Sequence, residues 1–133
     1  MDKYKIARRV HLIQGDLSYA ICSGDAVKLA CANLPYIPTH RLQSLNVAKF
    51  EPRIALEGGE EGLDYIKPLI KDAKSWLAAD GLLLLEIDAN QEFVATDYAT
   101  EQFPNASIQV IPDLAGHPRI LSIQNHEDTH NSL

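Results

Sequence analysis

Asn33-Leu34-Pro35-Tyr36 is the stretch of this sequence whose side-chain types and spacing point most directly to chemistry. It follows an apolar run, as a polar turn follows a strand at the carboxyl edge of an α/β sheet, where such sheets bind ligands. The Asn33 amide offers a donor and an acceptor, Pro35 stiffens the backbone, and Tyr36 supplies a flat face. This combination suits a planar amide or amino group. The alternative is an ordinary strand-to-loop turn with Tyr36 against the core.

Short apolar runs predict the sheet that would position this stretch. Residues 9–16 and 26–33 are apolar and end in turn residues, and residues 81–88 form a nearly continuous apolar run, typical of a strand covered on both faces. We expect a central strand at each. Two further runs, 106–113 and 119–125, flank so short a turn that they predict an antiparallel hairpin.

Two helices are expected to connect these strands. An apolar stripe at steps of three and four residues predicts a crossover helix whose regular part begins near Ile66, with Pro68 in its first turn and Gly81 as its stop. A second helix is expected from about Asn90 to Phe103. The first stripe consists of Leu63, Ile66, Leu69, Ile70, Ala73, Trp76 and Leu77.

Length and composition indicate one globular domain. The chain has 133 residues, of which 46% are hydrophobic and 23% charged, enough for one buried core. No apolar run approaches the roughly 20 residues of a membrane span, and the first ten residues lack the apolar core of a signal peptide, so we expect a cytoplasmic protein with no membrane contact. Residues 1–125 are expected to form the domain and residues 126–133 a disordered tail.

Charge, cysteine and histidine usage narrow the classes of partner. A net charge of -6 makes a nucleic-acid partner unfavourable without a local basic patch, which favours a protein or small molecule. Cys22 and Cys31 are too few for a disulfide framework or a zinc site, and we expect Cys31 to be a small buried thiol. His126 and His130 have helix-like metal spacing but no third ligand nearby, so we expect no metal site.

Longer stretches resemble a known family. Residues 33–38, NLPYIP, resemble the Asn-Pro-Pro-Tyr signature of amino-methyltransferases that use S-adenosylmethionine, with Leu34 replacing the first proline. Residues 50–66, FEPRIALEGGEEGLDYI, resemble the segment that marks the HemK family, the N5-glutamine methyltransferases of peptide-chain release factors. GLLLLEIDANQ and DLAGHPRIL are similar to that family's next strand and terminal hairpin. The resemblance runs from about Val10 to Gln124.

The resemblance implies methylation of a glutamine side-chain amide in a release-factor-like protein, with S-adenosylmethionine as cofactor. By position, it implies that Asn33 and the Pro35 carbonyl hold the target amide, that Tyr36 packs against it, and that Asp16 lies near the cofactor's adenine. Acceptors on both N–H bonds in a rigid pocket would withdraw the nitrogen lone pair from conjugation. Methyl transfer would then rely largely on positioning.

Five other residues receive roles through the same resemblance or through their setting. Glu51, Pro52 and the Gly58-Gly59 pair would shape the loop on the substrate side, either by direct contact or only as a tight hairpin. Glu86 stands within an apolar run and would need a hydrogen-bond partner if buried. We therefore expect it to be a structural anchor or rim residue rather than a catalyst.

The expected fold class is α/β: a partial Rossmann-like methyltransferase sheet, mainly parallel, with a C-terminal antiparallel hairpin and without the family's first two strands. The resemblance begins at the family's third strand, and the Gly-rich residues 57–62 lie in the substrate loop instead of between an early strand and helix. We therefore expect poor S-adenosylmethionine binding by this chain alone. Two functions stay open: a HemK-like methyltransferase, and a truncated, non-catalytic remnant that serves as a binding or assembly module.

A third alternative, methylation of a nucleic-acid base, fits the tetrapeptide but not the acidic balance. Without the family's first strands, residues 9–16 and 26–33 each lose a sheet neighbour, and unpaired edge groups need another partner. We expect a homodimer that pairs these edges about a twofold axis, or a complementing chain that supplies the front half of the domain.

Overall fold

The computed structural model describes residues 6, 8–22, 24 and 27–126, and is centred on a four-stranded sheet. The strands are β1 (Val27–Ala32), β2 (Leu77–Glu86), β3 (Ser107–Pro112) and β4 (Pro118–Gln124). Their order is β1-β2-β4-β3; β1 is parallel to β2, whereas β4 is antiparallel to both β2 and β3. The expected α/β class with a C-terminal antiparallel hairpin is confirmed, and the parallel part of the sheet in the described residues is the β1–β2 pair.

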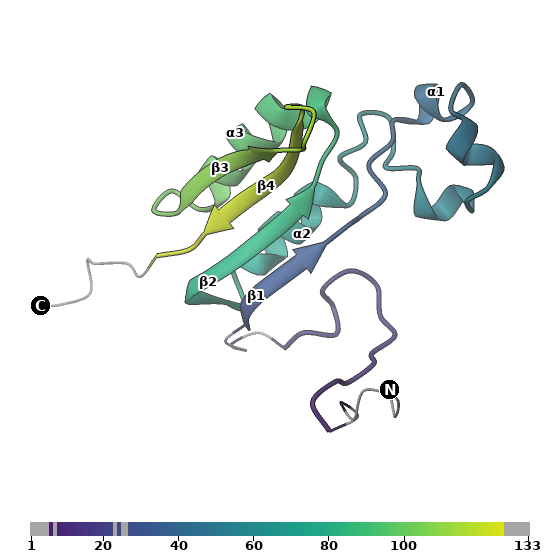
Figure 1. Cartoon of the computed structure of the whole chain (residues 1–133). Coiled ribbons are helices and arrows are strands. Elements are labelled where there is room, and N and C mark those ends of the chain that lie inside the picture. The colour runs from purple at the N-terminus through teal and green to yellow at the C-terminus, as the bar shows by residue number, and fades with distance from the viewer. Residues whose placement is uncertain (1–5, 7, 23, 25–26, 127–133) are drawn as a thin grey trace, which may run out of the picture.

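The helices lie mainly on one side of this sheet, where Figure 1 shows α2 and α3 together behind the strands. The expected helix start at Ile66, with Pro68 in the first turn, is confirmed, and so is the second helix. Residues 39–56 form a lobe that projects beyond the carboxyl end of β1 (Figure 1). No helix in the described residues is long and apolar enough to cross a membrane. The helical elements are α1 (Thr39–Leu42), η2 (Asn46–Lys49), η3 (Arg53–Ala55), α2 (Ile66–Ala73), η4 (Ala89–Gln91) and α3 (Glu92–Gln102).

The core lies between these helices and the sheet. Alternate residues of β2 and β4 face the helices, and the helical stripe of α2 packs against them because its apolar residues recur once per turn. The fully buried large side chains are Ile66, Ile70, Leu83, Leu85, Ile87, Leu121 and Ile123. The core therefore holds the carboxyl ends of β1 and β2 in place. Asn33 directly follows the end of β1.

The expected helix stop at Gly81 is wrong. Helix α2 ends at Ala73, and Gly81 lies within β2, where the pairing shifts from Val27–Leu77 to Leu29–Leu82. A Cβ atom at Gly81 would lie 2.8 Å from the Val27 carbonyl oxygen, so the glycine permits the close approach of the two strands at this bulge.

The strand expected at residues 9–16 is also absent. Residues 8–22 form turns and irregular backbone, and Leu12 and Ile13 are 83% and 71% exposed. An apolar run becomes a stable strand only when a neighbour completes its hydrogen bonds, and none does so here in the described chain. The segment is tethered instead by Ser18, whose hydroxyl donates to the Asp72 carboxylate over 3.2 Å.

The sheet face opposite α2 and α3 is open at β1. Ala30 and Ala32 face the helices, whereas Leu29 is 58% exposed and Cys31 is also exposed. The expectation of a buried Cys31 thiol is therefore wrong, because no helix in the described residues covers this face of the strand. The outer edge of β1 is likewise unpaired within the described chain, since β1 pairs with β2 alone.

Candidate functional site

A pocket of about 290 Å³ lies where β1 ends. It brings together three residues that the sequence predicts for the site: Asn33 and Tyr36 from the stretch after β1, and Glu51 from the projecting lobe. Its volume is near the lower end of the ~300–1,000 Å³ typical of ligand pockets, which suits one side chain better than a large cofactor. The lining residues are Asn33, Leu34, Tyr36, Ile37, Glu51, Ala55 and Leu56.

Tyr36 is held by its hydroxyl at the edge of this pocket. The hydroxyl donates to the Glu86 Oε1 atom over 2.8 Å, so Glu86 has the partner that an acidic residue in an apolar strand requires. Burial raises the pKa of Tyr36, and the hydrogen bond and charge of Glu86 raise it further, while Arg119 acts in the opposite direction. At neutral pH Tyr36 is therefore a neutral donor that presents its ring to the pocket, and Glu86 anchors it.

The glycine-rich loop, residues 57–62, is attached to the residues after Tyr36 by a short parallel pairing. The Ile37 N–H donates to the Leu56 carbonyl, and the Gly58 N–H donates to the Ile37 carbonyl, each over 2.9 Å. Thr39 extends the pairing by donating its N–H to the Gly59 carbonyl. The loop is thus a strand-like partner of the pocket wall rather than only a tight hairpin.

The loop requires glycine at Gly58 and at Gly59. A Cβ atom at Gly58 would lie 2.6 Å from the Pro35 carbonyl oxygen and 2.8 Å from the Tyr36 Cα. Gly59 has φ +89° and packs against the Asp64 carboxylate. Gly58 lets the loop backbone lie directly against Pro35 and Tyr36, whereas Gly59 leaves room for the Asp64 carboxylate. Neither glycine lines the pocket itself.

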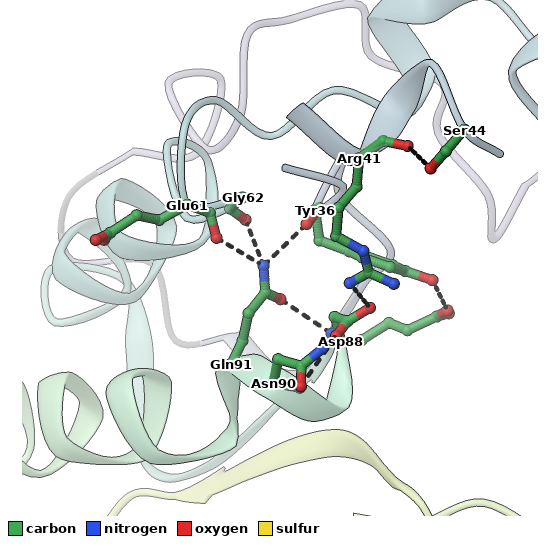
Figure 2. Close-up of polar contacts among 9 residues, drawn as sticks. Tyr36, Arg41, Ser44, Glu61, Gly62, Asp88, Asn90 and Gln91 are labelled. Carbon is green, nitrogen blue, oxygen red and sulfur yellow. Dashed lines mark hydrogen bonds and ion pairs between the residues drawn. The ribbon is translucent and has the colours of Figure 1, made fainter. Parts of the chain in front are cut away.

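Ion pairs hold the lobe and the loop in place. Arg53 binds the Glu57 carboxylate with two hydrogen bonds of 2.5 and 2.6 Å, and Thr39 donates to the same carboxylate over 3.0 Å. The Arg53 and Thr39 hydrogen bonds lower the pKa of Glu57. Arg41 reaches the Asp88 carboxylate over 3.1 Å and so connects α1 to the turn after β2 (Figure 2).

The remaining predicted residues, including Pro35, whose carbonyl oxygen lies close to Gly58, are outside the pocket lining. Pro52 precedes η3 and accepts the Ala55 N–H over 2.9 Å, so it shapes the turn from which Glu51 and Ala55 enter the pocket. Asp16 is exposed in the irregular segment before β1, where its carbonyl accepts the Tyr19 N–H. Its role near the cofactor stays a prediction.

Sequence reasoning missed a polar group behind the pocket. Gln91 is buried, and its side-chain nitrogen reaches the Tyr36 carbonyl (Figure 2). The available signal was the pair Asp88 and Gln91, three residues apart before a helix, which is the spacing of a capping box. The structure has this capping box.

In the described part of the chain, no three residues gather that could hold a metal ion. His126 contacts Ser107 over 2.8 Å, and His130 lies outside the described residues.

Comparison with known proteins finds relatives that are named glutamine methyltransferases, although no family model matches the sequence. The release factor glutamine methyltransferase of Moorella thermoacetica is 39% identical over 127 residues, which are 95% of this chain and 44% of that protein. The same enzyme of Rhodopirellula baltica is 34% identical, over 93% of this chain and 43% of its own length. A ribosomal protein uL3 glutamine methyltransferase of Francisella tularensis is 31% identical over 68% of this chain and 29% of its own length. The chain thus spans less than half the length of these relatives.

A solved structure is similar in fold. It is the E. cuniculi Mtq2-Trm112 complex, described as responsible for the methylation of the eRF1 translation termination factor. The likeness has a TM-score of 0.57 at 17% identity, and it covers 85% of this chain and 60% of the matched chain. This supports the partial Rossmann-like methyltransferase fold.

Proposed function

We propose that this chain, which belongs by its sequence to the family of release factor glutamine methyltransferases, supplies the part of a methyltransferase site that holds a protein glutamine amide. The observation that carries the proposal is the convergence of Asn33 and Tyr36 on one pocket at the carboxyl end of β1. The substrate class proposed is a release factor or a similar translation protein, as the names of the relatives indicate.

The proposed chemistry is binding and orientation. The Asn33 side-chain oxygen and the Pro35 carbonyl each accept one N–H of the target amide, and the Tyr36 ring packs against its plane. Two fixed acceptors weaken the conjugation of the amide nitrogen with its carbonyl, which leaves the lone pair available in a defined direction. Glu86 keeps the Tyr36 ring in place through its hydroxyl, and no group of this scheme acts as a general base.

S-adenosylmethionine fits these described residues poorly by themselves. The pocket is small, and Asp16, the residue that the family resemblance assigns to the cofactor, has no hydrogen bond that ties it to the pocket in the described chain. We therefore propose that cofactor contacts come largely from sequence that the relatives have beyond the region that this chain matches. Cofactor binding is a property of such a completed site.

The test measures methyl transfer from labelled S-adenosylmethionine to a bacterial release factor. The chain is assayed alone and with the part of the Moorella thermoacetica relative that it does not match. We expect transfer in the second case and weak calorimetric binding of S-adenosylmethionine in the first. Asn33→Ala should reduce the rate of transfer far more than cofactor affinity, because its contact is with the target amide. An equal loss of both would contradict the role of Asn33.

The second candidate function is a non-catalytic binding or assembly module, and the open edge and face of β1 favour it. Unpaired strand edges are templates for another polypeptide. A homodimer through this edge, or pairing with a complementing chain, would satisfy the backbone groups of β1. Sedimentation at tens of micromolar protein should show the dimer. A monodisperse monomer, whose β1 edge is paired only after the complementing chain is added, would support pairing with that chain instead. Release-factor binding without methyl transfer by the completed protein would favour the module.

A further inference from the structure

Gln91 is a buried side chain at the junction of three segments, and only 4% of its surface is exposed. Its Nε2 atom lies 2.8 Å from the Tyr36 carbonyl oxygen and 3.1 Å from those of Glu61 and Gly62 (Figure 2). An amide nitrogen has two hydrogens, so three acceptors at these distances share them. Gln91 therefore joins the residue after Pro35, the end of the glycine-rich loop and the turn after β2.

The other end of the Gln91 amide is also fixed. Its Oε1 atom accepts the Asp88 N–H over 2.9 Å, and the Asp88 carboxylate accepts the Asn90 N–H over 3.0 Å. Because an N–H faces the oxygen and carbonyls face the nitrogen, the orientation of the amide follows from its partners. Gly62 provides the space: a Cβ atom there would lie 2.3 Å from Gln91 Nε2 and 2.1 Å from the Tyr36 carbonyl oxygen.

A helix cap would use only part of this arrangement. Capping of η4 needs the Gln91 oxygen and the Asp88 side chain, which are local in the sequence. The three contacts of the nitrogen go to residues 36, 61 and 62, which lie outside that helical turn. The nitrogen thus holds the pocket wall and the loop behind it.

We propose that Gln91 is a positioning residue for the target amide: by holding the Tyr36 carbonyl, it sets the Tyr36 ring and the preceding Pro35 carbonyl relative to Asn33. This inference rests on the proposed function for its catalytic consequence. Tyr36 is then fixed at two points, its carbonyl by Gln91 and its hydroxyl by Glu86. Gln91 itself does not line the pocket and acts through Tyr36.

The first test reads the placement of Tyr36 without any activity. In protein labelled with ¹³C at the tyrosine ring, an NMR titration follows Tyr36 in the unaltered protein and in Gln91→Met. Burial and then the Glu86 hydrogen bond raise the pKa of Tyr36 in the unaltered protein. If the ring shifts when its carbonyl is released, the pKa of Tyr36 falls toward its ordinary value in Gln91→Met, which introduces no new charge. A loss of general stability alone would not move this pKa in the folded protein.

The matched control is Gln124→Met. Gln124 also donates its side-chain N–H groups to two backbone carbonyls, those of Asp80 at 3.0 Å and Gly81 at 3.3 Å, and it is not among the pocket-lining residues. The pKa of Tyr36 should be unchanged in this variant. Gln91→Glu keeps an oxygen that accepts from Asp88 but turns a carboxylate oxygen toward the three carbonyls, so it loses the positioning contacts and retains the helix cap. Its negative charge acts on Tyr36 as well, so this variant is read by kcat and not by the Tyr36 pKa.

The second test uses the completed methyltransferase. We expect kcat for methyl transfer to fall by about tenfold or more in the Gln91 variants, with the Kd for S-adenosylmethionine within about twofold of the unaltered protein. Folded Gln91 variants with an unchanged Tyr36 pKa and an unchanged kcat would overturn the inference. A shifted Tyr36 pKa in a protein whose unaltered form transfers no methyl group would support the placement of Tyr36 and overturn the proposed function.

A measurement on the unaltered protein needs no variant. The side-chain N–H protons of Gln91 should exchange with solvent about a hundredfold more slowly than those of the exposed Gln43, because they are buried and paired. Exchange of both at the same rate would overturn the inference even if every Gln91 variant failed to fold.

Discussion

Replacement of Tyr36 by phenylalanine tests the anchor that holds the pocket wall. The change removes one hydroxyl and its 2.8 Å hydrogen bond to Glu86, and leaves the aromatic ring. A hydrogen bond to a charged group contributes about 1.5–3 kcal/mol to the free energy of unfolding. The loss is largest when the partner left behind is buried. Glu86 is only half-buried, so water replaces part of the lost contact. We therefore expect a loss of about 1 kcal/mol in the free energy of unfolding.

Urea unfolding at pH 7 measures this loss, with Tyr98→Phe as the control. Tyr98 is also half-buried, but its hydroxyl makes no hydrogen bond within the described part of the chain, so its removal should cost less than about 0.5 kcal/mol. The slope of free energy against urea should be the same in both variants and the unaltered protein.

A double-mutant cycle with Glu86→Ala assigns the loss to the pair. If the hydrogen bond is responsible, Tyr36→Phe should cost about 1 kcal/mol less in the Glu86→Ala background than in the unaltered protein. The same loss in both backgrounds would refute the reasoning.

The pH dependence of the free energy of unfolding gives an independent check. Because burial and Glu86 raise the pKa of Tyr36, its contribution is full below the unfolded-state pKa of about 10 and is lost as pH rises through the folded-state pKa.

Three further predictions concern Gly58, the Arg41–Asp88 ion pair and Cys31. Gly58→Ala should destabilise the protein by about 1–3 kcal/mol in urea unfolding, because its Cβ would meet the Pro35 carbonyl and other backbone atoms. Burial alone would raise the pKa of Asp88, but the Asn90 N–H and Arg41 lower it, so its contribution is present above the unfolded-state pKa and lost as pH falls. Arg41→Ala should therefore move acid unfolding, followed by circular dichroism, to higher pH. Native protein should react rapidly with a thiol reagent at Cys31, as located by peptide mass; a requirement for denaturant would contradict its exposure.

The elements with strong periodicity could be predicted from the sequence, whereas their partners could not. Helix α2 begins at Ile66 because the apolar stripe and Pro68 both specify its first turn. Most of the run at residues 81–88 is a strand, but β2 starts earlier, at Leu77, and ends at Glu86. Gly81 belongs to a bulge between two paired strands, and only that pairing distinguishes its role from a helix stop.

The same limit explains the errors at β1 and before it. An apolar run indicates a strand, but it does not say whether a helix covers each face, and Cys31 is therefore exposed. Residues 9–16 have a strand pattern without a strand neighbour in the described chain. At the candidate site, Asn33 and Tyr36 were singled out by their types and spacing and Glu51 by the family resemblance, and all three line one pocket. Gln91 lies in a polar turn, and its three carbonyl partners are distant in sequence.

The attachment of β1 has a consequence for local opening. The β3–β4 hairpin closes through a short turn, but β1 is held in the sheet by one parallel ladder to β2, and the chain between them includes the whole lobe and α2. Closing so long a connection costs more entropy than closing a hairpin. We expect amide protons of residues 29–32 to exchange through partial opening at lower free energy than those of residues 83–85. Asn33 would move away with β1, so a bound substrate that contacts Asn33 would have to dissociate before this opening. Bound substrate would therefore slow amide proton exchange selectively in β1.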